Sequence, residues 1–240
     1  MDGVELAARF SLITNHLRFC GPESAEKQFH EYLSKKDNAK EVESSLKKFE
    51  GLYVYLSAIA DKSGKNFIDY DVVEGYWIGN SLLDKFNDED IKKIITQLMG
   101  RGLPKTIGNS LKAKLPSGFV PHHNFNVFFV GVGNITGSVE ATVQNMDNCR
   151  ISHGIVQDIV GDHLVVKTDS VAKDSTGYIL KDDIKNVVYH PDFMPGLKKG
   201  DTVALHWGYA CMRLTDKQAS NLDKYTRKIL DIINSQLKAS

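Results

Sequence analysis

Cysteine is scarce in this chain of 240 residues, which has Cys20, Cys149 and Cys211. Their number is odd, they lie far apart, and no CxxC pair occurs. The sequence therefore excludes a disulfide framework and the usual structural zinc motifs. Free thiols persist in a reducing compartment, so we expect a cytoplasmic protein.

Long apolar runs and an excess of one charge sign are also missing. No stretch approaches the roughly 20 apolar residues that cross a bilayer, and the first residues, MDGVELAARFSLI, carry acids where a signal peptide needs basic groups. Lys plus Arg and Asp plus Glu both total 30, whereas a dedicated nucleic-acid-binding protein usually has a basic excess. We expect a soluble chain that binds neither membranes nor nucleic acid.

The motifs of several large enzyme classes are absent as well. The sequence has no phosphate-binding loop, no dinucleotide fingerprint, no Ser-His-Asp arrangement and no HExxH motif. Gly131-Val132-Gly133 lacks the third glycine of a dinucleotide turn. No reaction class follows from motifs, and a role other than catalysis is favoured.

The first hundred residues carry apolar side chains at spacings of three and four. This pattern predicts helices over 25–33, 42–60, 71–83 and 89–99, with Asn87 or Asp88 capping the last one. Between residues 100 and 121, glycine and proline recur too often for regular structure. We therefore predict a helical domain over 1–115 and a second domain over 116–240.

The second domain has β-type patterns. Strands are expected over 126–132, 151–160, 164–168 and 202–207, with a short helix near 139–147 and a hairpin turn at Gly161-Asp162. Thr215 and Gln218 have capping-box spacing before a final helix. The predicted fold class is α+β: a helical N-terminal domain followed by a small OB-like β-barrel with a C-terminal helix.

Two residues of this domain have the chemistry of metal ligands. In the strand over 202–207, Val203 and Leu205 alternate with Ala204 and His206, so His206 points away from the core face. Cys149 lies at the edge of an element, just before a strand. A thiolate and an imidazole together suit iron, copper, nickel or zinc. Two protein ligands suffice for a metal that brings most of its own ligands.

Two segments of the second domain resemble a known family. CRISHGIVQDIVGDHLVVKT (149–168) and GLKKGDTVALHWGYACMRLTDKQA (196–219) are similar to the opening and closing segments of HypC-type chaperones of nickel–iron hydrogenase maturation. The resemblance implies that Cys149 and His206 hold an Fe(CN)2(CO) fragment. It also implies a HypD-like maturation partner and delivery to a hydrogenase large-subunit precursor. The first 148 residues have no counterpart there, and the whole chain resembles an uncharacterised family.

Other donors and other functions remain open at this stage. His153 stands where the chaperones usually have proline, and it is a tentative third ligand. His122 and His123, expected in a solvated loop, and Cys211 are further candidates. A second hypothesis is a non-haem metal-dependent enzyme whose site draws on His122 or His123, Cys149, His153 and His206. A third is a metal-free protein-interaction module with a buried Cys149.

Overall fold

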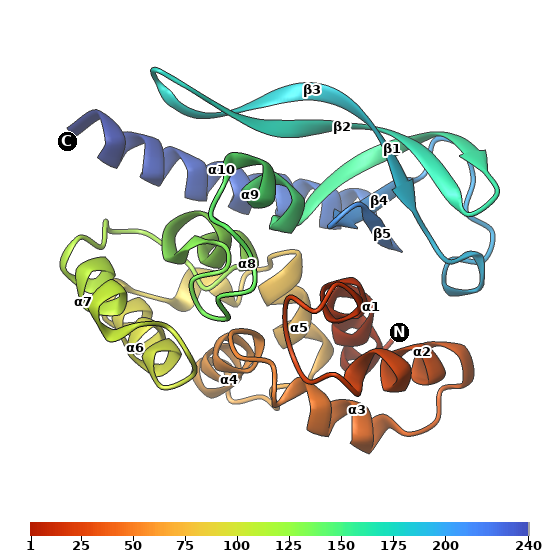
Figure 1. Cartoon of the computed structure of the whole chain (residues 1–240), viewed down its shortest axis with the longest axis horizontal. Helices are drawn as coiled ribbons and strands as arrows, with labels where there is room; N and C mark the ends of the chain where they lie inside the picture. Colours follow the sequence, from red (N-terminus) through yellow and green to blue (C-terminus); the bar gives the residue numbers. More distant parts are fainter. Residues whose placement is uncertain (240) are drawn as a thin grey trace.

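The computed structural model describes residues 1–239, which form two layers (Figure 1). One layer consists of helices from the first half of the chain, and the other is a β-barrel with the long last helix against it. The helices of the first layer are α1 (Gly3–His16), α2 (Ala25–Lys35), α3 (Ala39–Leu46), α4 (Leu52–Ser63), α5 (Tyr70–Trp77), the 3-10 turn η1 (Leu83–Lys85), α6 (Asp88–Met99) and α7 (Lys105–Ala113). None of the helices within residues 1–239 combines the length and apolar character that crossing a membrane requires.

The helix ends follow local chemistry. Asn87 caps α6 through a reciprocal capping box with Asp90, as expected. The helix predicted over 42–60 is in fact two helices, because the chain turns between Leu46 and Leu52. The helix predicted over 71–83 ends at Trp77. Gly79 then takes a φ of +96°, and a Cβ there would lie 2.1 Å from the Tyr225 ring.

Residues 100–149 contain the largest departures from the predicted elements. Helix α7 occupies part of the stretch expected to be irregular. The predicted strand over 126–132 is wrong: α8 (His123–Phe125) runs directly into a π-helix over Asn126–Gly131. A short apolar run that is buried has the same pattern in a strand and in a helix, so periodicity alone could not separate them. Helix α9 (Val143–Cys149) then leads to the barrel.

The barrel consists of β1 (Ser152–Val160), β2 (His163–Asp174), β3 (Gly177–Val188), β4 (Thr202–His206) and β5 (Tyr209–Arg213). The strands close in the order β1-β2-β3-β5-β4, with β3 and β5 parallel and the other neighbours antiparallel. Helix α10 (Asp216–Ala239) follows, and Thr215 and Gln218 form the predicted capping box. The α+β class with a helical first part, a barrel and a C-terminal helix is confirmed.

Strand β4 shows how the two layers meet. Val203 and Leu205 belong to the core inside the barrel, whereas Ala204 belongs to the main core, which runs through both layers. His206 lies on the Ala204 side, and its exposed fraction is 1%. The alternation along β4 is therefore as predicted, but His206 does not point away from the core, because the main core lies on its side of the strand. Helix α1 contacts β5 of this hairpin and accepts a hydrogen bond from His206, so this outer face is covered.

Candidate metal centre

Three donor side chains meet between the layers. His123 comes from α8, Cys149 from the last turn of α9, and His206 from the end of β4. One ligand atom from each lies within 4.8 Å of the other two. The Cys149 Sγ is 3.8 Å from His123 Nε2, and the two imidazole rings are 5.2 Å apart between centroids. The structure thus brings together the predicted pair, Cys149 and His206, and adds His123.

The protonation of His206 follows from its hydrogen bond. Its Nδ1 is 3.0 Å from the carbonyl oxygen of Phe10 in α1. A carbonyl only accepts, so Nδ1 carries the proton and Nε2 has a free lone pair. Among the described residues, this buried Nε2 has no hydrogen-bond partner. A ring held by its N–H to a carbonyl, with the other nitrogen free, is the usual arrangement of a metal-binding histidine.

His123 is held at both nitrogens. Its Nδ1 is 2.9 Å from the Tyr76 hydroxyl, and its Nε2 is 2.9 Å from the Cys149 carbonyl oxygen. Because the carbonyl only accepts, Nε2–H donates to it and the Tyr76 hydroxyl donates to Nδ1. A hydroxyl can also accept, so Nδ1–H can donate to Tyr76 instead. Nε2 is then free to bind a metal.

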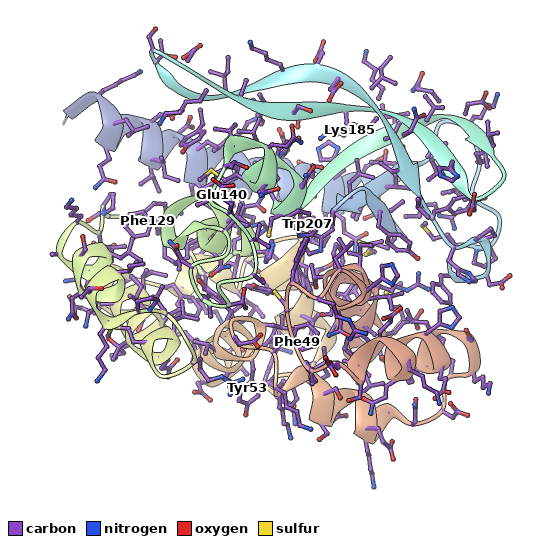
Figure 2. All side chains as sticks on the ribbon, viewed as in Figure 1. Phe49, Tyr53, Phe129, Glu140, Lys185 and Trp207 are labelled. Carbon is purple, nitrogen blue, oxygen red and sulfur yellow. The ribbon has the colours of Figure 1, made fainter. Side chains whose placement is uncertain are left out.

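The turn that follows His206 is strained. Trp207 and Gly208 have φ values of +50° and +70°, the pattern of a two-residue type I′ hairpin loop between β4 and β5. A bulky residue rarely adopts this conformation, and such strain is frequent at functional sites. Figure 2 shows Trp207 where the barrel layer meets the helices, with Phe49 of the helical layer below it. The Trp207 ring packs on Phe19 at 4.5 Å between centroids.

Asn124 fixes the position of Cys149. Its side-chain Nδ2 donates to the Ile151 carbonyl at 3.1 Å and to the Thr226 hydroxyl at 2.8 Å, and its Oδ1 accepts from the Ile151 N–H at 2.9 Å. Together with the bond from His123 to the Cys149 carbonyl, these contacts attach the α9–β1 connection to α8. Two consecutive residues of α8 therefore supply one donor and position another.

Buried charges anchor α9 from the other side. Asp147 has an exposed fraction of 5%, and it pairs with Arg150 at 3.0 Å and with Lys185 of β3 at 2.5 Å. Its Oδ1 also accepts from the Val171 N–H of β2 at 2.8 Å. Burial raises the pKa of Asp147, but Arg150 and the other partners lower it more, so the net shift is downward. A buried carboxylate with these partners ties α9 to the barrel wall.

The site is uncharged before a metal binds. Burial lowers the pKa of His123 to about 4 and holds the pKa of His206 well below its usual range, so both imidazoles are neutral near pH 7. Burial raises the pKa of the Cys149 thiol, which the nearby Trp207 side chain lowers to a smaller extent. A metal cation would displace the thiol proton and gain a thiolate ligand.

A small cavity adjoins the three donors. Its volume is about 70 Å³, and Tyr76, Trp77, Phe19 and Trp207 are among the residues that line it. One water-sized group needs about 10–15 Å³ of such space, so the cavity accepts a few groups of that size. A nucleotide, a sugar or a peptide side chain of large size does not fit. A metal with small ligands does.

The other predicted donors lie elsewhere. His153 is on β1, where burial lowers its pKa and Asp169 and Asp223 are near, and it is outside the group of three donors. His122 accepts a hydrogen bond from the Asn124 N–H at 3.1 Å and stacks on the Tyr225 ring. Cys211 is buried on β5, also outside the group.

The expectation of a solvated loop at His122 and His123 is wrong. Both residues are buried, and burial lowers the pKa of His122 to about 3. One signal in the sequence pointed to this: residues 115–139 contain no Lys, Arg, Asp or Glu. A segment of this length without charged residues is typically buried, and its histidines are then buried as well.

The comparisons with known proteins identify a family but no activity. A family model matches residues 1–240, and the chain belongs to this family, described as a family of unknown function (DUF6390). The match includes the helical layer and the barrel alike, and with them all three donors. No curated protein and no solved structure matches the chain.

Proposed function

We propose that this protein is a metal-fragment carrier that binds an iron centre through His123, Cys149 and His206 and passes it to a partner protein. The observation that carries the proposal is the convergence of these three donors within 4.8 Å, one of them the unpartnered Nε2 of His206. An iron fragment of the Fe(CN)2(CO) type holds three diatomic ligands. Three protein donors complete its octahedron.

The hydrogen bonding of His123 supports a carrier that can release its metal. When it does not bind metal, its Nε2–H donates to the Cys149 carbonyl at 2.9 Å. Withdrawal of His123 from the iron therefore restores a hydrogen bond and leaves no buried group unpaired. Cys149 is partly buried and lines the cavity.

The partners follow from the resemblance of 149–168 and 196–219 to HypC-type chaperones. On this basis we propose a role in hydrogenase maturation in the cytoplasm, with a HypD-like partner that supplies the fragment and a nickel–iron hydrogenase large-subunit precursor that receives it. The barrel with its C-terminal helix agrees with the fold that the resemblance implies. Helix α8 adds His123, and the helical layer covers the fragment.

Metal analysis of anaerobically purified protein, with infrared spectra of the CO and CN stretches, tests the proposal. We expect bound iron in the wild type and at least a tenfold loss of occupancy in His123→Ala, Cys149→Ala and His206→Ala, since loss of one of three donors weakens a metal site strongly. His153→Ala is the matched control and should retain iron. Wild-type occupancy in Cys149→Ala and His206→Ala would reject the site.

A second candidate function is a non-haem metal-dependent enzyme. The observation in its favour is the cavity of about 70 Å³ next to three protein ligands, because catalytic metal sites keep an open position for a small substrate. An enzyme keeps its metal through many turnovers, whereas a carrier loses it to an acceptor. Iron-57 that stays on the chain in the presence of the apo acceptor would favour the enzyme.

A further inference from the structure

Polar groups without partners gather around the cavity. Within residues 1–239, four buried atoms of its lining residues have no hydrogen-bond partner: Ser11 Oγ, Trp77 Nε1, Trp207 Nε1 and His206 Nε2. Buried polar groups in folded proteins are nearly always paired, so each exception needs a reason. Four exceptions at one small cavity indicate a ligand with several polar ends.

These atoms are of two kinds. His206 Nε2 is an acceptor and is one of the three metal donors. The indole N–H groups of Trp77 and Trp207 can only donate, and the Ser11 hydroxyl can donate as well. Trp207 is only partly buried, whereas Trp77 and Ser11 are buried. Trp77 and Ser11 remain as donors toward the ligand.

Trp77 and Ser11 lie next to the metal donors. The Trp77 ring is 4.7 Å from the His123 ring and 5.6 Å from the His206 ring between centroids, and it stacks on Phe10. Ser11 follows Phe10, whose carbonyl holds His206. The exposed fractions of Ser11 and Trp77 are 1% and 3%, so bulk water does not compete for these donors.

We infer that Trp77 Nε1–H and Ser11 Oγ–H donate hydrogen bonds to small acceptor ligands that are bound to the metal, such as the nitrogen end of cyanide or the terminal nitrogen of azide. This inference rests on the proposed metal site. The ligand class is small anions of two or three atoms, which the cavity of about 70 Å³ accommodates. Carbon monoxide is a poor acceptor and gains nothing from these donors, so the site selects metal centres that carry anionic ligands.

The test uses the whole chain loaded with Co(II) under anaerobic conditions and titrated with azide, followed by visible absorption. We expect the azide Kd of Co(II)-loaded Trp77→Phe and Ser11→Ala to rise about five- to tenfold above that of the Co(II)-loaded wild type, as expected for the loss of one buried hydrogen bond. Ser63→Ala on α4, outside the cavity, is the matched control and should leave both affinities unchanged. The cyanide stretch of the cyanide adduct should also shift in Trp77→Phe.

The outcomes separate this inference from the proposed function. If the wild type binds no Co(II), the proposed metal site fails. If Co(II) binds but azide does not, or if azide binds equally well to wild type, Trp77→Phe and Ser11→Ala, the donors do not serve the metal's ligands and the inference is overturned. Should Trp77→Phe fail to fold, Ser11→Ala and the shift of the wild-type cyanide band in D2O decide. An unshifted band with an unchanged Ser11→Ala Kd refutes the inference.

Discussion

At the scale of single residues, the notable feature is the burial of His122, His123 and His206 as neutral imidazoles. Burial lowers the pKa of His122 to about 3 and that of His123 to about 4, and holds that of His206 well below 6.5. In the unfolded chain each would titrate near 6.5. As pH falls below 6.5, these three histidines bind protons in the unfolded state but remain neutral in the folded state. Their contribution to the free energy of unfolding is therefore fully present above pH 6.5 and is lost as pH falls below it.

We predict that the free energy of unfolding of the metal-free protein falls between pH 6 and pH 4 by up to about 4 kcal/mol per pH unit, since each histidine contributes about 1.4 kcal/mol per unit. Urea unfolding at a series of pH values measures this slope. His123→Gln should make the slope shallower by about a third. A flat profile over this range would contradict the neutral, buried state of the three rings.

Tyr76 is a positioning residue for His123. Its hydroxyl is 2.9 Å from His123 Nδ1 and would accept a hydrogen bond from Nδ1–H when Nε2 binds the proposed metal. We predict that Tyr76→Phe lowers the affinity for Co(II) about 10- to 100-fold, the usual effect of losing such a partner. Tyr55→Phe is the matched control, because the Tyr55 ring stacks on Tyr76 but its hydroxyl bonds to Asn126. Equal Co(II) affinity of the two variants, measured by titration, would remove Tyr76 from the site.

At the scale of elements, the connection between the π-helix and α9 forms one wall of the cavity. Ile135, Thr136 and Ser138 of this connection line it, and the Ser138 hydroxyl donates to the Phe19 carbonyl at 2.8 Å. Gly133 has a φ of +78°, and a Cβ there would lie 1.8 Å from the Val139 carbonyl oxygen. The close approach of backbone to backbone in this wall therefore depends on glycine.

We predict that Gly133→Ala disrupts the wall, whereas Gly137→Ala does not. Gly137 has a similar φ of +70°, but a Cβ there meets nothing within 4 Å. Both substitutions introduce the strain of a positive φ, about 1 kcal/mol. Only Gly133→Ala adds a backbone clash, so it should destabilise by more and speed Co(II) release. Stopped-flow release into a chelator and hydrogen exchange of residues 131–142 check this, and identical release rates in the two variants would contradict it.

At the scale of the whole molecule, the metal donors join the two layers. His206 comes from the barrel and is held by Phe10 of α1, while His123 is held by Tyr76 of α5. The main core includes residues of both layers. A metal bound at the proposed site would therefore stabilise the helical layer and the barrel together.

We predict a single unfolding transition whose midpoint rises on addition of Co(II). At a free metal concentration of 100 times Kd the gain is about 2.7 kcal/mol, because the metal binds the folded state only. Far-UV circular dichroism and tryptophan fluorescence should give the same midpoint, and Cys149→Ala should abolish the shift. Separate transitions for the two probes, or an equal shift in Cys149→Ala, would show that the metal does not couple the layers.

The sequence by itself determined the features that depend on near neighbours. These are the helices predicted over 25–33 and 89–99, the N-cap at Asn87, the capping box at Thr215, the Gly161 turn, and the alternation of side chains along β4. Each depends on periodicity or on a hydrogen bond between residues a few positions apart. The pairing of Cys149 with His206 could be predicted only through the resemblance to HypC-type chaperones, since no local rule joins residues so distant.

Only the tertiary structure decided what the site contains and how deep it lies. His206 is buried because α1 packs on the β4–β5 hairpin, where the Phe10 carbonyl, 196 positions earlier, accepts a hydrogen bond from its Nδ1–H. His123 joins the site because its ring reaches Cys149, 26 positions later. The π-helix after His123 was mistaken for a strand because a buried apolar run has no polar face to show its period. Burial depends on what packs from far along the chain, and the spacing of residues along a strand or helix does not record it.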